Sequence, residues 1–214
     1  MTHLSRFVVS GSGRCGTKWM SQALTASGVP CGHERVYNAS PERKWPDGIV
    51  ADSSWMAAAQ LDSIDVPVVL LVRHPLSVVK SWVEVGFFGR DLQNPTHGPL
   101  EEFAPQVYEW PHVPDRALAM WMILTEAVLR RADLIVRIDK LTTGGFGRLL
   151  SWAGADPGNA SLGVRVPPVN QHHDARKLTG IRHDPRWADH DPDLADDAYE
   201  LAHSLGYESA RPEW

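Results

Sequence analysis

The sequence predicts an α/β fold in three layers, with a mostly parallel central sheet flanked by helices. Residues 7–11 form an apolar run that leads into a glycine-rich turn and a helical pattern. A second apolar run at residues 66–72 is followed by a helix that begins at Pro75. A further helical pattern at residues 115–131 precedes a strand pattern at residues 133–141. Such alternation is typical of three-layer proteins with parallel strands.

The composition indicates one globular domain, residues 1–214. Of its residues, 43% are hydrophobic and 22% are charged, and a chain of this length buries about 70% of its unfolded surface. The net charge of −5 argues against general nucleic-acid binding, which requires a basic surface. No stretch has the roughly 18 apolar residues of a membrane span, and the N-terminus lacks a signal-peptide pattern. We therefore expect a cytoplasmic protein that binds neither membranes nor nucleic acids.

The first strand leads into a loop whose composition suits a phosphate. Glycines at positions 11, 13 and 16 allow backbone amides to converge on an anion, and the helix predicted at residues 17–27 points its positive end there. The glycine spacing matches the P-loop pattern G-x-x-x-x-G-K-[ST], which predicts a P-loop-like fold. However, Thr17 precedes Lys18, the reverse of the order that nucleotide triphosphatases need for Mg²⁺ and the terminal phosphates. ATP hydrolysis is therefore disfavoured, whereas Arg14 is placed to clamp the bridging oxygen of a leaving phosphate.

The remaining elements follow in an order that suits one sheet. A short extended return is predicted at residues 29–32, after the first helix. Residues 48–52 predict another strand, and residues 53–59 a capped helix or turn. The helix that begins at Pro75 is expected to continue to residue 85, and a last helical stretch lies around residues 193–205.

A second pair of residues lies at the end of the next predicted strand and in the helix after it. Arg73 lies at the end of its strand, and Ser81 follows eight residues later, about two turns into the next helix. Together with G-S-G-R-C-G-T-K-W at residues 11–19, this pair resembles the sulfotransferases that use 3′-phosphoadenosine 5′-phosphosulfate (PAPS). The resemblance covers residues 7–27 and 66–84.

The resemblance implies how PAPS is held. In that family the first loop binds the 5′-phosphosulfate, and an arginine and a serine at this separation bind the 3′-phosphate. Arg14 stands where the family has a basic residue that stabilises charge on the bridging oxygen. The loop departs from the family at Cys15 and Lys18, where hydroxyl residues are common. The implied donor-binding residues are Ser12, Gly13, Arg14, Cys15, Gly16, Thr17, Lys18, Arg73 and Ser81.

Two further segments are expected to act at this site. Residues 86–114 contain five prolines and several aromatic side chains, which favours an irregular lid lining the acceptor pocket. The resemblance implies that a loop at residues 169–182 closes over the 3′-phosphate through Arg176 and Lys177. A metal site is an alternative use of nearby polar residues, although their spacing matches no familiar ligand pattern. These residues are His172, His173, Asp174, His183 and His190.

The acceptor needs a general base, and three residues are candidates. The first helix runs about 16 Å away from the loop and the extended return recovers about 13 Å, which brings His33 and Glu34 back to it. Asp52 ends another strand at the same predicted edge of the sheet. A carboxylate base needs a raised pKa in a dry pocket, whereas a histidine does not. The resemblance favours Glu34, because some bacterial sulfotransferases use a glutamate soon after the first helix.

The predicted function is transfer of a sulfuryl group from PAPS to a hydroxyl or amine of a small-molecule or carbohydrate acceptor. Arg14 and either Glu34 or His33 are the expected catalytic residues, and this route requires no metal. Two alternatives remain open. One is a P-loop kinase of a small metabolite, which Mg²⁺-dependent ATP binding would support. The other is a catalytically inactive nucleotide-binding relative, in which neither His33 nor Glu34 affects turnover.

Overall fold

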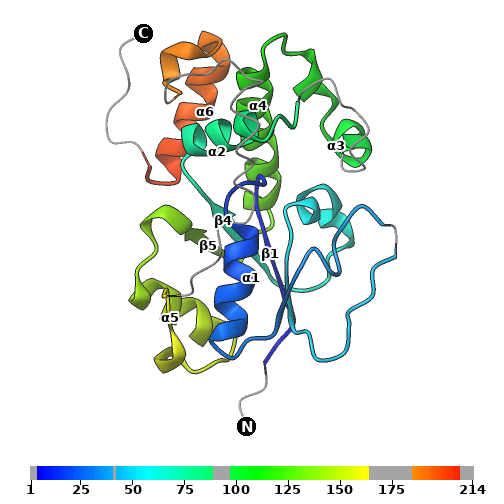
Figure 1. The fold of residues 1–214 in the computed structure, drawn as a ribbon, viewed down its shortest axis with the longest axis vertical. Coiled ribbons are helices and arrows are strands. Elements are labelled where there is room, and N and C mark those ends of the chain that lie inside the picture. The colour runs from blue at the N-terminus through cyan, green and yellow to red at the C-terminus, as the bar shows by residue number, and fades with distance from the viewer. Residues whose placement is uncertain (1–3, 41, 89–96, 164–184, 208–214) are drawn as a thin grey trace. The chain divides into compact units, whose positions relative to one another are not determined.

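The protein forms two compact units. The structure is a computed structural model that describes residues 4–40, 42–88, 97–163 and 185–207. Unit 1 comprises Met1–Val72 and Thr125–Val169, and unit 2 comprises Arg73–Leu124 and Asn170–Trp214. The five strands of the described sheet all belong to unit 1, whereas unit 2 is helical where it is described (Figure 1).

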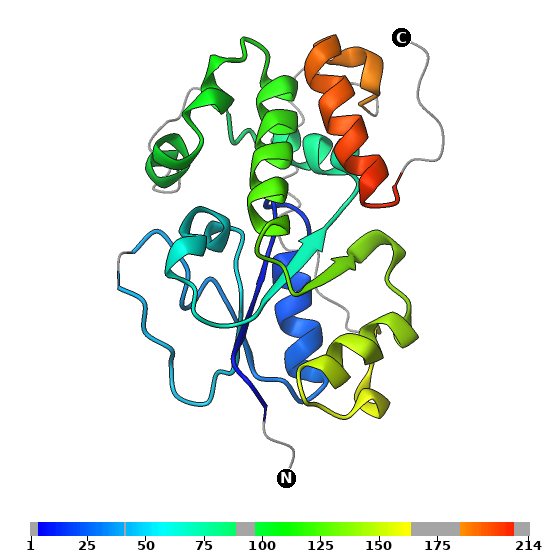
Figure 2. The ribbon, with the colours of Figure 1, turned by 180° about the vertical axis from the view of Figure 1, so that it is seen from behind.

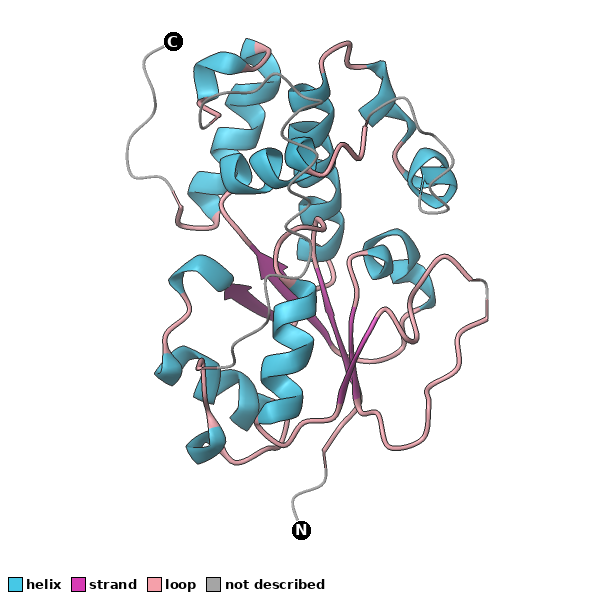
Figure 3. Cartoon of the chain, in the orientation of Figure 1, coloured by secondary structure: helices cyan, strands magenta, loops and turns pink. Residues whose placement is uncertain are grey.

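The centre of unit 1 is a five-stranded sheet in which every pair of neighbouring strands is parallel. Its order is β2-β3-β1-β4-β5, and Figure 3 shows these strands in magenta. The prediction of an α/β fold with a parallel sheet is therefore confirmed. The strands are β1 (Phe7–Ser10), β2 (Cys31–His33), β3 (Ala51–Ser53), β4 (Val68–Val72) and β5 (Leu134–Arg137).

The strand order makes β1 the central strand, with β3 on one side and β4 on the other. The chain thus leaves β1 toward one half of the sheet and returns later to build the other half. Ligands of open α/β sheets bind beyond the carboxyl ends of the strands, where such a reversal occurs. In unit 1 this edge is formed by the residues that follow Ser10, His33 and Ser53.

Two helices of unit 1 cover one face of this sheet, as Figure 1 and the reverse view in Figure 2 show. Helix α1 (Thr17–Ala26) contributes Met20, Ala23 and Leu24 to a buried core cluster. Helix α5 (Thr143–Trp152) contributes Phe146, Leu149 and Leu150 to the same cluster. Strand residues that share this core include Phe7, Val9, Val69 and Leu71, which alternate along β1 and β4 as the pleat requires.

Helix α5 was not predicted from the sequence. It contains Gly144, Gly145 and Gly147, and each glycine costs a helix about 1 kcal/mol relative to alanine. Two features offset this cost. The Thr142 side chain caps the helix by accepting a hydrogen bond from the Gly145 amide at 3.1 Å, and the apolar side chains on one face pack into the core.

Short helical turns complete unit 1. They are η1 (Met56–Ser63), η3 (Ile138–Lys140) and η4 (Pro157–Asn159). The strand expected at residues 133–141 is shorter than predicted, because the chain turns into η3 directly after Arg137.

Unit 2 consists of helices, including two in the segment predicted to be an irregular lid. Where residues 86–114 are described, they contain the short helices α3 (His97–Phe103) and η2 (Pro105–Glu109). Pro99 and Pro105 lie in the first turns of these helices, where a backbone amide has no intrahelical acceptor and proline is tolerated. The other helices of unit 2 are α2 (Pro75–Glu84), α4 (Val113–Leu129, in unit 2 as far as Leu124), η6 (Trp187–Asp189) and α6 (Pro192–Ser204).

A buried pair of side chains joins α4 to the segment before α6 in unit 2. His190 Nδ1 and Asp115 Oδ1 are 2.9 Å apart, and both side chains are almost fully buried. The same Asp115 oxygen accepts a hydrogen bond from the Asp191 amide at 3.3 Å. In the described part of the chain, no helix is both long enough and apolar enough to cross a membrane.

Candidate functional site

The loop between β1 and α1 follows a path that only glycine permits at two positions. A Cβ atom on Gly11 would collide with the carbonyl oxygen of Leu71 and would lie 2.8 Å from Sγ of Cys15. Gly16 has a φ of +96°, and a Cβ atom there would collide with the Ile138 side chain. Because the loop is pressed against β4 and against Ile138, packing fixes its backbone.

The backbone of this loop suits an anion. Gly13 and Arg14 have φ values of 73° and 51°, and left-handed residues in such loops turn successive amides toward one concavity. Gly16 is the N-cap of α1, and no side chain caps this helix, so its first amides have no intrahelical acceptor. Within the described residues, the amides of Ser12, Gly13 and Gly16 make no hydrogen bond to another backbone group. Together these donors could hold a phosphate or sulfate, and we call this loop the anion cradle.

The side chains of the loop divide into buried and accessible groups. Cys15 is fully buried and belongs to the hydrophobic core, so its thiol is not accessible to a ligand. Ser12 is also buried, and its hydroxyl donates to the Gly13 carbonyl at 3.3 Å. Arg14 and Lys18 are half-exposed. The accessible charge of the loop therefore comes from these two cationic residues.

The start of α1 and the end of β2 bring three predicted site residues together. The Thr17 hydroxyl lies 3.4 Å from His33 Nε2, and that nitrogen lies 3.6 Å from Glu34 Oε1. Thr17 is held in place because its carbonyl oxygen accepts a hydrogen bond from the Ser53 hydroxyl at 2.9 Å. The expectation that the extended return brings His33 and Glu34 back to the first loop is confirmed.

The environment of this cluster changes the pKa of both base candidates. Burial, and to a smaller extent the positive charge of Lys18, lowers the pKa of His33 to about 4. Burial and the negative charge of Asp52 raise the pKa of Glu34, against the opposing effect of Lys18. His33 is therefore neutral at pH 7, and its contact with Glu34 is not a charged pair. Glu34 becomes a stronger base than an ordinary carboxylate, and His33 a weaker base than an ordinary histidine.

Glu34 has an unusual backbone conformation. Its φ is +55°, a left-handed value that costs a residue with a side chain roughly 1–3 kcal/mol. Its amide donates to the Ser53 carbonyl at 3.3 Å, which continues the pairing of β2 with β3 by one residue. Strained residues of this kind are concentrated at functional sites.

The third base candidate, Asp52, is engaged with the backbone. Its Oδ1 accepts a hydrogen bond from the Arg35 amide at 3.0 Å, and its Oδ2 accepts from the amides of Val36 and Tyr37 at 3.2 and 3.0 Å. The side chain is fully buried, and burial raises its pKa against the effect of these amides. Asp52 therefore holds the turn after β2 rather than offering a carboxylate to an acceptor.

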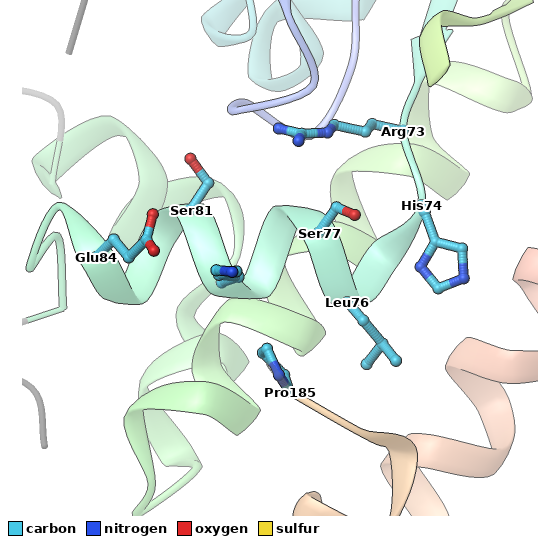
Figure 4. Close-up of a pocket in the computed structure, with 8 residues that line it drawn as sticks. Arg73, His74, Leu76, Ser77, Ser81, Glu84 and Pro185 are labelled. Carbon is cyan, nitrogen blue, oxygen red and sulfur yellow. The ribbon is translucent and has the colours of Figure 1, made fainter. Parts of the chain in front are cut away.

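Unit 2 contains a hollow of about 590 Å³ along α2. Figure 4 shows the Arg73 side chain extending along the side of α2 that carries the hydroxyls of Ser77 and Ser81. The predicted pair of Arg73 and Ser81 therefore lines one hollow. The lining residues are Arg73, His74, Leu76, Ser77, Lys80, Ser81, Glu84 and Pro185.

The backbone at Arg73 is fixed within unit 2. Trp121, fully buried on α4, donates from its indole Nε1 to the Arg73 carbonyl at 3.1 Å. His74 is the N-cap of α2 and Pro75 its first residue, so the chain enters the helix directly after Arg73. Sequence reasoning missed Ser77, although its spacing of four residues from Ser81 places both on one face of the helix.

The predicted late loop and most residues of the alternative metal site fall in a part of the chain that the structure does not describe. Arg176, Lys177 and the whole loop at residues 169–182 lie outside the described residues, as do His172, His173, Asp174 and His183. In the described ranges, no group of three or more His, Cys, Asp or Glu side chains is arranged to hold a metal ion.

Comparisons with known proteins add no relative to this picture. A scan against models of protein families and a search among curated proteins found no match to the chain.

Proposed function

We propose that the protein is a PAPS-dependent sulfotransferase with a P-loop-like, three-layer fold. The observation that carries the proposal is the juxtaposition, in unit 1, of an anion cradle with a carboxylate whose pKa is raised. The cradle is the loop at residues 11–16, and the carboxylate belongs to Glu34. Glu34 contacts His33, which in turn contacts the hydroxyl of Thr17 at the start of α1. The parallel sheet with β1 at its centre suits this proposal, because the cradle then follows the central strand.

In this proposal the loop holds the 5′-phosphosulfate of PAPS. The amides of Gly13 and Gly16 and the N-terminus of α1 bind its oxygens, and Lys18 adds a positive charge at the first turn. Arg14 stabilises the negative charge that develops on the bridging oxygen when the sulfur–oxygen bond breaks. The helix dipole and two cationic side chains thus supply the charge that in many nucleotide enzymes comes from Mg²⁺.

The hollow in unit 2 is the proposed site of the 3′-phosphate. Arg73 and Lys80 contribute two positive charges and Glu84 one negative charge, so these three side chains make the lining net positive. The hydroxyls of Ser77 and Ser81 add donors that a phosphate accepts. A 5′-diphosphate such as ADP lacks the group that would use these contacts.

The proposed reaction is an in-line transfer. The acceptor hydroxyl gives its proton to Glu34 as its oxygen bonds to sulfur, while the bond from sulfur to the bridging phosphate oxygen breaks. The electron pair of that bond leaves with 3′-phosphoadenosine 5′-phosphate (PAP). The raised pKa of Glu34 and the lowered pKa of His33 favour Glu34 as the base. His33 then remains neutral beside it.

The runner-up is a kinase of a small metabolite, which the spacing of Gly11 and Gly16 favours. It is opposed by the order of Thr17 and Lys18. The position of the Thr17 hydroxyl opposes it as well. This hydroxyl contacts His33 Nε2 at 3.4 Å, whereas a kinase would need it to bind Mg²⁺.

Calorimetric binding of PAP, ADP and ATP, each with and without Mg²⁺, tests the proposal without knowledge of the acceptor. A sulfotransferase binds PAP more tightly than ADP, with no requirement for Mg²⁺. A preference for ATP with Mg²⁺ would establish the kinase instead. Preference for PAP, without transfer of the sulfuryl group from PAPS to water or to any screened hydroxyl or amine, would indicate the inactive relative.

A further inference from the structure

Asp52 stands at a structurally demanding place in unit 1. It is the middle residue of β3, is fully buried, and lies directly opposite Gly32 in the register between β2 and β3. An ionised carboxylate in such a place is unfavourable unless polar groups surround it. Its position therefore calls for an explanation beyond packing.

The three hydrogen bonds to Asp52 all come from the turn that follows Glu34. The amides of Arg35, Val36 and Tyr37 converge on one carboxylate, at 3.0, 3.2 and 3.0 Å. Convergence of three successive amides requires the chain to reverse immediately after β2. The residue that makes the reversal is Glu34, with its φ of +55°.

Gly32 shows how tightly the carboxylate is set against the end of β2. A Cβ atom at Gly32 would lie 2.7 Å from Asp52 Oδ1 and 2.8 Å from Cγ of Arg35. No side chain fits between the carboxylate and the turn. The Asp52 carboxylate and the Arg35 side chain thus already fill the space that a side chain at position 32 would need.

We propose that Asp52 is the positioning residue of Glu34: its carboxylate holds the turn that keeps Glu34 in its left-handed conformation beside His33. This inference rests on the proposed function, in which Glu34 is the base. A strained backbone persists only where its surroundings hold it in place. Here the hydrogen bonds to Asp52 hold the turn that follows Glu34. A base displaced by about 1 Å loses roughly 10²-fold in rate, so the turn matters for chemistry as well as for folding.

The first test measures the backbone of Glu34 directly. In Asp52→Asn, one oxygen becomes an NH₂ group that cannot accept a hydrogen bond, so at least one amide of the turn loses its partner. We expect amide–Hα couplings and chemical shifts to report the loss of the positive φ at Glu34 in the folded variant. Asp62→Asn, an exposed carboxylate on η1, is the control and leaves Glu34 unchanged. A positive φ retained in Asp52→Asn would overturn the proposal.

The second test is a double-mutant cycle on the transfer of the sulfuryl group from PAPS to water or to the hydroxyl of a screened acceptor, measured as the release of PAP. Asp52→Asn should lower turnover by about 10²-fold in the wild-type background and by less than about twofold in Glu34→Gln, because the residue acts through Glu34. Equal losses in both backgrounds would mean general damage and would refute the positioning role. If the wild-type protein releases no PAP, the proposed function fails, while the measurement of φ still decides the role of Asp52.

A second variant covers the case in which Asp52→Asn does not fold. Gly32→Ala keeps the carboxylate but forces it away from the turn, and it should reproduce both the loss of the positive φ and the loss of turnover. A folded Gly32→Ala protein with normal Glu34 geometry and normal turnover would count against the proposal.

Discussion

Units 1 and 2 carry their candidate binding features by different means. In unit 1 the backbone carries the geometry: the path at Gly11 and Gly16 is fixed by packing, and Glu34 is held at a left-handed φ. In unit 2 the side chains of Arg73, Ser77 and other residues line a hollow along one regular helix. A backbone-built site responds to substitution through the fold, whereas a side-chain-built site loses only the group that is removed. The two units should therefore fail in different ways when they are mutated.

The largest effect is expected from Gly11→Ala. Its methyl group meets the Leu71 carbonyl, which belongs to a central strand and cannot move aside, so we expect a loss of about 3 kcal/mol in the free energy of unfolding. Urea denaturation measures it. Gly144→Ala is the matched control, because its methyl group meets open space on a helix and should stabilise by about 0.5–1 kcal/mol. An unchanged unfolding midpoint for Gly11→Ala would contradict the inference that packing fixes the backbone of the loop.

Glu34→Gln should separate binding from chemistry in unit 1. We expect PAPS binding to be unchanged and turnover to fall by about 10²-fold or more, because the amide cannot take a proton. Release of PAP at saturating PAPS and calorimetry measure the two properties. Glu102→Gln, an exposed residue on α3, is the control. Unchanged turnover in Glu34→Gln would move the role of base to His33.

Arg73→Ala tests the side-chain-built hollow in unit 2. Removing the guanidinium should weaken PAP binding by about 1.5–3 kcal/mol and leave ADP binding little changed, since only PAP carries a 3′-phosphate. The unfolding midpoint should stay close to that of the wild type, because the side chain is half-exposed. Equal losses for PAP and ADP would contradict a 3′-phosphate site.

The pH dependence of turnover should report the pKa of the base in unit 1. The base acts when ionised, so kcat/KM rises with pH through its pKa and falls by about tenfold per pH unit below it. Because burial and Asp52 raise the pKa of Glu34, the acid limb should lie above 4.5, the ordinary value of a glutamate. An acid limb near 4 would instead match His33, whose pKa burial lowers to about 4.

The smallest effect is expected from Ser77→Ala. A neutral hydroxyl on the rim of the hollow contributes about 0.5–1.5 kcal/mol, which weakens PAP binding by a few-fold. The same experiment with ADP is the control. A loss as large as that of Arg73→Ala would show that the hollow depends on its geometry as strongly as the loop does, and the contrast between the units would disappear.

Much of the fold was predictable because strong local signals agree with the tertiary structure. The apolar runs that became β1 and β4, and the proline that opens α2, fixed the main elements of both units to within a few residues. Helix α5 escaped because its glycines oppose a helix and only the packing of side chains such as Phe146 decides otherwise. Helix α3 escaped because Pro99 suggests a loop unless its place in the first turn is known.

The site was predictable where chemistry follows from residue type and spacing. The glycine loop was singled out by its spacing, whereas the pair of Arg73 and Ser81 was singled out by the resemblance; the roles of both stay predictions. The role of Asp52 was not, because it depends on three backbone amides that are brought together only by the register of β2 with β3. The opposite pKa shifts of His33 and Glu34 also depend on burial, which no spacing reveals.

The composition of α5 has a consequence for the order in which unit 1 is assembled. With three glycines among its ten residues, α5 has little tendency to coil by itself and gains its stability from contacts with side chains of β1, β4 and α1. In a nascent chain, residues 143–152 emerge after all five strands have been synthesised. The segment therefore remains unstructured until the strands and α1 offer a surface to pack on, and the helix forms as the core closes.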